Sequence, residues 1–184
     1  MAEAMLRARL ADRAPEVTVG SVGLLFDDRP AEPGAVRAMA RRGIDLSGFR
    51  SRVMTAEAFE GSSLILVMER LHVREVSVLA PGLFRRTFTL PEFVDQAEPF
   101  GPRGDEPLLD WVTRIGQVRR PSDYLIEDVR SEVPDPMGQS GRAFRRIADL
   151  IDDLLARLVD LAWPLGADLD LETDPLAPST PGGH

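Results

Sequence analysis

The strongest structural signal in the sequence is an amphipathic repeat near the C-terminal end of the chain. Large apolar residues recur there at intervals of three and four positions: Phe144, Ile147, Ile151, Leu154, Leu158 and Leu161. This spacing lines one face of a helix, so the sequence predicts a long helix over residues 143–163 that ends at Pro164. An apolar face of this length must be covered, and we expect a β-sheet against it.

Two segments in the middle of the chain predict neighbouring strands of a parallel sheet. Residues 64–68 form a continuous apolar run, which is typical of a strand buried on both faces. Helical spacing follows over residues 71–79, and residues 85–90 then alternate between apolar and polar side chains. A strand, a helix and a second strand make a βαβ unit, so the sequence predicts an α/β fold. A further short strand is expected over residues 16–19.

The remaining helices are expected to be shorter. Residues 1–11 predict a helix that starts without a capping residue, and residues 33–42 predict another that ends before Gly43. Further helical segments are expected over residues 56–59, 91–96 and 108–118. With 184 residues the chain suits one domain, which we place at residues 1–163. The Pro, Gly, Ser and Thr content of residues 164–184 predicts a disordered tail.

The composition disfavours several classes of function. A net charge of −8 disfavours nucleic acid or an anionic membrane as a partner. No apolar run approaches a membrane span of roughly eighteen residues, and charges near Met1 exclude a secretory signal, so we expect a cytoplasmic protein. The chain contains no cysteine, which removes thiolate catalysis and cysteine metal sites from the sequence as given. His72 with Glu75 makes only a weak metal pair, and we predict no metal and no cofactor.

Asp135 is the candidate catalytic residue that the sequence singles out. Pro134 and Pro136 fix the backbone on both sides and hold the aspartate extended, and Gly138 lets the chain turn before the long helix. A carboxylate on a stiff loop is a common way to place a catalytic group. Asp-Pro-x-Gly is also a good turn sequence, and the segment alone favours that simpler interpretation.

Four segments of the chain carry a family resemblance. They are residues 1–4 (Met-Ala-Glu-Ala), 43–48 (Gly-Ile-Asp-Leu-Ser-Gly), 64–68 (Leu-Ile-Leu-Val-Met) and 133–138 (Val-Pro-Asp-Pro-Met-Gly). In this order they resemble the low-molecular-weight protein tyrosine phosphatase family, over a domain of residues 1–163 in which residues 100–131 look like an insertion. The resemblance implies a three-layer α/β sandwich with a parallel four-stranded sheet. It also implies hydrolysis of phosphate monoesters through a cysteinyl-phosphate.

The resemblance further implies that part of the family's active site is missing from this sequence. In the family, a phosphate-binding loop of Cys, five residues, Arg, Ser or Thr and then Pro directly precedes Met-Ala-Glu-Ala, with which this chain begins at Met1. Backbone amides of such a loop bind phosphate and lower the thiol pKa. We therefore expect an N-terminally incomplete phosphatase that lacks the nucleophile and the central first strand, and is inactive as given. Losing that strand removes about 8 to 15 kcal/mol of apolar burial, so we expect poor folding unless the sheet closes across the gap.

Three residues match positions of the family's site. Asp135 matches the general acid that protonates the leaving oxygen, Ser21 matches a serine that supports the phosphate loop, and Met137 stands at the substrate rim, where the family often has an aromatic residue. The implied partner is a phosphorylated protein or a small phosphate ester. Two alternatives stay open. One is a non-catalytic phosphate-binding or interaction module, and the other is an arsenate reductase-like protein, which would need cysteines that the chain lacks.

Overall fold

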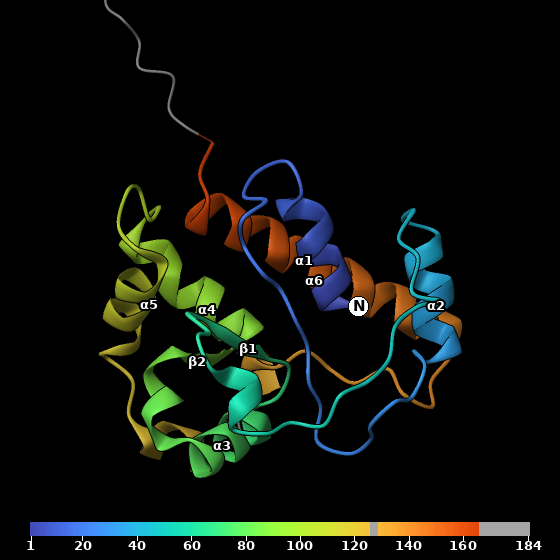
Figure 1. Ribbon diagram of the computed structural model, residues 1–184, viewed down its shortest axis with the longest axis horizontal. Coiled ribbons are helices and arrows are strands. Elements are labelled where there is room, and N and C mark those ends of the chain that lie inside the picture. Colours follow the sequence, from blue (N-terminus) through green and yellow to red (C-terminus); the bar gives the residue numbers. More distant parts are fainter. Residues whose placement is uncertain (126–128, 166–184) are drawn as a thin grey trace, which may run out of the picture.

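The computed structural model describes residues 1–125 and 129–165, and Figure 1 shows its elements along the chain. The helices are α1 (Ala2–Leu10), α2 (Pro33–Ala40), α3 (Arg70–Leu79), α4 (Leu90–Ala97), α5 (Leu108–Gly116) and α6 (Gly141–Ala162). The strands are β1 (Ile65–Val67) and β2 (Thr87–Thr89). The short 3-10 helices are η1 (Glu57–Phe59), η2 (Pro81–Arg86), η3 (Glu98–Phe100), η4 (Pro121–Leu125) and η5 (Val129–Ser131). The predicted helices are confirmed with small shifts at their ends. Residues 166–184, which hold most of the predicted tail, lie outside the described residues.

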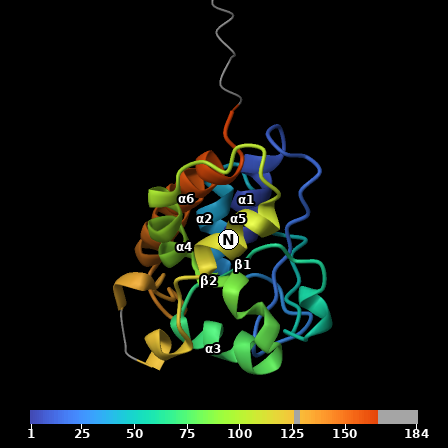
Figure 2. The ribbon, with the colours of Figure 1, turned by 90° about the vertical axis from the view of Figure 1, so that its left-hand side faces the viewer.

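The elements form three layers around a small sheet. Figure 2 shows β1 and β2 between α3 on one side and the helices α1, α2, α4 and α6 on the other. Both α3 and α4 contact both strands, which places a helix against each face of the sheet. The predicted α/β fold is therefore confirmed.

The two strands pair in parallel, as the βαβ pattern predicts. Ile65 lies opposite Thr87, and Val67 opposite Thr89. All three residues of β2 are buried, and the ring of Phe88 meets that of Phe93 edge to face with centroids 5.0 Å apart. The alternation of apolar and polar residues predicted a strand over residues 85–90. Residues 85 and 86 belong to η2 and residue 90 begins α4, so β2 is shorter than predicted.

Helix α6 is the longest element and organises the main core. Ser140 caps it by accepting a hydrogen bond from the backbone N–H of Ala143, at 3.4 Å. Its apolar face packs chiefly against helices α1, α2 and α4, so helices cover much of the face for which a sheet was expected. No helix within residues 1–125 and 129–165, α6 included, is long and apolar enough to cross a bilayer.

The strand predicted over residues 16–19 is not formed, and this prediction is wrong. Within the described residues the sheet has two strands, and the only other strand-like pairing is an isolated bridge between Gly23 and Val53. A strand needs a hydrogen-bonding neighbour, and here the carbonyl of Val19 accepts instead from the guanidinium of Arg7, at 3.0 and 2.6 Å. The four-stranded sheet of the family is thus represented by two strands in the described chain.

Helix α5, inside the predicted insertion of residues 100–131, belongs to the core. Trp111 is fully buried and its ring meets Phe93 edge to face at 5.6 Å between centroids. Gly116 allows α5 to approach η2 closely, since a Cβ there would lie 1.9 Å from the carbonyl oxygen of Arg85. Helix α5 is therefore packed as part of the domain.

Candidate active site

Asp135 lies in a tight turn, and its side chain is exposed to solvent. Its Oδ1 accepts a hydrogen bond from the backbone N–H of Met137 at 2.9 Å, and its carbonyl accepts from the side chain of Gln139 at 2.9 Å. Gly138 completes the turn with a φ of +74°, which favours glycine. Within residues 1–125 and 129–165, Oδ2 has no hydrogen-bond partner. The turn interpretation and an available carboxylate are therefore both compatible with the structure.

The segment of residues 132–140, called here the Asp135 loop, is docked at the carboxyl end of β1. The backbone N–H of Val133 donates to the carbonyl of Met68, one residue past the strand, at 2.9 Å. The side chain of Glu132 accepts from the backbone N–H of Arg70, the first residue of α3, at 2.9 Å. In open α/β sheets, ligands bind outside the carboxyl ends of the strands, so this is a suitable place for a catalytic loop.

Ser21 is tied to the beginning of α1. Its hydroxyl donates to the carboxylate of Glu3, and its carbonyl accepts from Arg52 at 3.1 Å. Glu3 also pairs with Arg7 at 2.7 Å, one helical turn further along α1. The sequence analysis missed Glu3 as the partner of Ser21 and Arg7 as the partner of Glu3, although a carboxylate four residues before an arginine is a recognisable helical pair.

The residue at the predicted substrate rim, Met137, is strongly exposed at 64% of its surface. A second exposed apolar segment, which the sequence analysis did not single out, is Leu24, Leu25 and Phe26. Two backbone hydrogen bonds close this loop at its base, from Met54 to Gly23 at 2.7 Å and from Asp28 to Ser51 at 2.9 Å. The sequence signal for it was three large apolar residues placed between a glycine and two aspartates.

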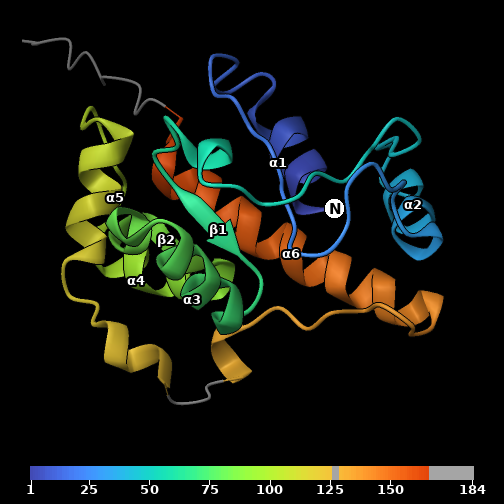
Figure 3. The ribbon, with the colours of Figure 1, turned by 60° about the horizontal axis from the view of Figure 1, so that its bottom comes forward.

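Of the three predicted site residues, Asp135 and Met137 share one loop and a hydrogen bond, whereas Ser21 is bound to α1. In Figures 1 and 3 the N-terminal end of α1, to which Ser21 is bound, points toward the Asp135 loop. No hydrogen bond or ion pair joins Asp135 to Ser21 in the part of the chain that the structure describes.

A metal centre is not formed by the described residues. None of their His, Cys, Asp and Glu side chains gather in groups of three or more that could hold an ion. His72 and Glu75 both lie on α3, where Glu75 is exposed.

Comparison with known proteins identifies the class to which this fold and loop belong. The family model described as low molecular weight phosphotyrosine protein phosphatase matches residues 1–101. The protein named "Probable low molecular weight protein-tyrosine-phosphatase EpsP" from Ralstonia nicotianae is 36% identical over 134 residues, which cover 71% of this chain and 87% of the relative. Etp of Escherichia coli K12 is 34% identical over 97 residues, 52% of this chain and 63% of the relative. The chain belongs to the low molecular weight phosphotyrosine protein phosphatase family.

Solved structures agree on the fold. The low molecular weight protein tyrosine phosphatase from T. tengcongensis superimposes with a TM-score of 0.64 at 22% identity, covering 86% of this chain and 87% of that one. Vibrio vulnificus Wzb, solved with benzylphosphonate, gives a TM-score of 0.62 at 21% identity and covers 86% of both chains. At these identities the structures show the fold alone.

Proposed function

We propose that this chain forms the acid-bearing part of a protein tyrosine phosphatase, and that the 184 residues alone do not turn over substrate. The observation that carries the proposal is the docking of the Asp135 loop at the carboxyl end of β1, with its carboxylate exposed, in a member of this phosphatase family. The chain has no cysteine, and our proposal assigns the nucleophile of the family reaction to residues encoded upstream of the Met1 codon. This proposal includes a phosphorylated protein or a small phosphate ester as substrate.

The chemistry assigned to Asp135 is proton transfer to the leaving oxygen. A cysteine thiolate attacks phosphorus, the P–S bond forms and the P–O bond to the leaving group breaks. Asp135, protonated at that moment, gives its proton to the departing oxygen, so the alcohol or phenol leaves neutral. The resulting carboxylate then takes a proton from water as the water cleaves the P–S bond, which releases phosphate and the thiolate.

Ser21 and Met137 receive supporting roles in this proposal. The hydroxyl of Ser21 is directed to the beginning of α1, which is where a phosphate-binding loop preceding Met1 would end. Exposed Met137, two residues after the acid, offers an apolar contact at the rim for an aromatic leaving group. Vibrio vulnificus Wzb is described with benzylphosphonate, whose ring and tetrahedral phosphorus support an aromatic phosphate ester as the substrate class.

The test compares the chain as it stands with an extended protein that begins with the in-frame residues encoded upstream of the Met1 codon. With p-nitrophenyl phosphate, the 184-residue chain is expected to show no turnover. The extended protein is expected to hydrolyse the ester, and Asp135→Asn is expected to lower its kcat by about 10²- to 10⁴-fold.

Asp45→Asn is the matched control for this substitution. Asp45 is also an exposed loop aspartate, and its Oδ1 likewise accepts from the backbone N–H two residues on, at 2.8 Å to Ser47. Its substitution should leave kcat within about twofold, because the acid in question is Asp135. An in-frame stop codon directly upstream, or full activity in Asp135→Asn, would overturn the proposal. The first result would favour the non-catalytic phosphate-binding module.

A further inference from the structure

We propose that Glu132 is a positioning residue for Asp135. Glu132 is itself held by Arg70, which packs against a buried cluster beside β2, and this series of contacts is called here the brace. This inference rests on the proposed role of Asp135 as general acid. Two hydrogen bonds fasten the residues three and two positions before the acid, both at 2.9 Å. The side-chain carboxylate of Glu132 accepts from the backbone N–H of Arg70, and the backbone N–H of Val133 donates to the carbonyl of Met68. Val133 is 2% exposed, so its bond is shielded from water.

The carboxylate of Glu132 meets a helix terminus that lacks a cap of its own. The residue at the N-cap position of α3, Glu69, makes no side-chain capping bond, so Glu132 satisfies a backbone N–H that the helix leaves unpaired. A negative charge at this end also complements the helix dipole. Glu132 therefore joins the Asp135 loop to α3 by a bond that is both charge-assisted and directional.

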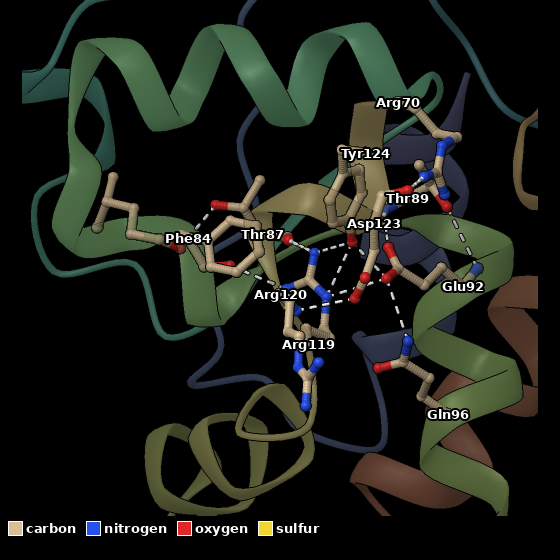
Figure 4. Close-up of polar contacts among 11 residues, drawn as sticks. Arg70, Phe84, Thr87, Thr89, Glu92, Gln96, Arg119, Arg120, Asp123 and Tyr124 are labelled. Carbon is tan, nitrogen blue, oxygen red and sulfur yellow. Dashed lines mark hydrogen bonds and ion pairs between the residues drawn. The ribbon is translucent and has the colours of Figure 1, made fainter. Parts of the chain in front are cut away.

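Arg70 carries the connection from Glu132 to the segment that precedes the loop. Its guanidinium donates to the carbonyl of Asp123 and lies 4.5 Å from the centre of the Tyr124 ring. Figure 4 shows Arg70 and Tyr124 side by side next to β2. One residue thus holds Glu132 with its backbone and η4 with its side chain.

Tyr124 belongs to a buried group with Arg119 and Glu92, called here the Arg119 cluster (Figure 4). The Arg119 and Glu92 side chains are 2% and 10% exposed, and their Nε and Oε1 atoms lie 2.9 Å apart. The tyrosine hydroxyl donates to Glu92 and accepts from Arg119. Arg119 also donates to the carbonyls of Phe84 and Thr87, at 2.8 and 2.6 Å. These bonds fix η4 to the core, so Arg70 packs against a stationary surface.

The functional consequence concerns geometry at the acid. A general acid must reach the leaving oxygen at hydrogen-bond distance, and small displacements cost large factors in rate. The prolines around Asp135 stiffen the loop, and Pro136 is buried, but within the described residues neither proline attaches the loop to the domain by a hydrogen bond. Glu132 and Val133 provide that attachment, and the brace behind Arg70 keeps it in one position.

The first test measures attachment without any catalysis. Amide hydrogen exchange at Val133 in the 184-residue chain is expected to accelerate about tenfold in Glu132→Ala, because the loop loses one of its two anchoring bonds. Glu132→Gln keeps an acceptor oxygen and should restore protection to within about threefold of the wild type. Glu75→Ala, the matched removal of an exposed glutamate on α3, should change nothing. Wild-type exchange at Val133 in Glu132→Ala would overturn the brace.

The second test separates positioning of the acid from general damage to the active site. In the extended protein, Glu132→Ala should lower kcat/KM for phenyl phosphate about tenfold and for p-nitrophenyl phosphate only about twofold, because a poorer leaving group depends more on protonation. An equal loss for both esters would overturn the positioning role. If the extended protein hydrolyses neither ester, the proposed function fails, while the exchange experiment still decides whether Glu132 holds the loop.

Discussion

The Asp135 loop and the Arg119 cluster are two rigid parts of one chain that are built in opposite ways. Asp135 is exposed and stiffened by flanking prolines and backbone hydrogen bonds. Glu92, the carboxylate of the cluster, is 10% exposed and is held by an arginine and a tyrosine. A carboxylate that passes a proton to substrate, as we propose for Asp135, stays in contact with solvent. A carboxylate that only fixes structure can be buried against a permanent charge.

The largest expected effect on stability comes from removing the positive charge of Arg119 from the Arg119 cluster. Arg119→Ala leaves Glu92 without its ion pair in a site shielded from water, and should lower the free energy of unfolding by about 3–5 kcal/mol. Urea denaturation followed by circular dichroism measures this directly. Arg120→Ala removes the neighbouring, exposed arginine and should cost no more than about 0.5 kcal/mol. Equal effects of the two substitutions would mean that the cluster adds no stability beyond an ordinary surface charge.

A second prediction tests how tightly the cluster region is packed. Gly116→Ala places a Cβ 1.9 Å from the carbonyl oxygen of Arg85, which is too close for a non-bonded contact, so α5 must move away from η2. We expect a loss of about 1–3 kcal/mol in thermal or urea unfolding. Gly141→Ala, at the start of α6 with its nearest neighbour 3.9 Å away, is the control and should be neutral or slightly stabilising. A neutral Gly116→Ala would show that α5 sits loosely on η2.

The two regions also differ in what the sequence could tell. The Asp135 loop was readable because its constraints are local, since proline and glycine act on their own backbone and on the residues beside them. The helices and both paired strands were readable for the same reason. The Arg119 cluster was not, since Arg119, Tyr124 and Glu92 are joined only by the fold. The failed strand at residues 16–19 shows the same limit, because β-branched residues favour a strand only where a neighbouring strand exists.

A third prediction addresses the backbone of the Asp135 loop. Gly138→Ala introduces no steric contact within 4 Å, so its cost is confined to the positive φ of +74° and should be about 1–2 kcal/mol. Gly48→Ala, which is equally open but lacks a positive φ, should change stability by less than about 1 kcal/mol, with either sign. Unfolding of the two variants in urea, side by side, checks the difference. Indistinguishable variants would mean that the loop readily adopts another turn and is less rigid than the prolines imply.

The smallest expected effect that separates the two regions is the pH dependence of stability. Burial, reinforced by the hydrogen bond to Glu92 and opposed by the charge of Arg119, raises the pKa of Tyr124 above its ordinary value of 10.0. Because the folded state holds this proton more tightly than the unfolded state, the stabilisation is intact below pH 10 and declines as the pH rises above it. Tyr124 is the single tyrosine of the chain, so its ultraviolet absorbance reports this group alone.

In the folded protein, the phenolate absorbance is expected to appear only above pH 10, together with loss of the helical circular dichroism signal. Tyr124→Phe removes the titrating group and should flatten the decline in stability that begins at that pH. Asp135→Asn changes a carboxylate in the other region and should leave the tyrosine titration unchanged. If the phenolate forms at its ordinary pKa while the protein stays folded, the hydroxyl of Tyr124 reaches solvent. The Arg119 cluster would then not be a buried counterpart of the exposed Asp135 loop.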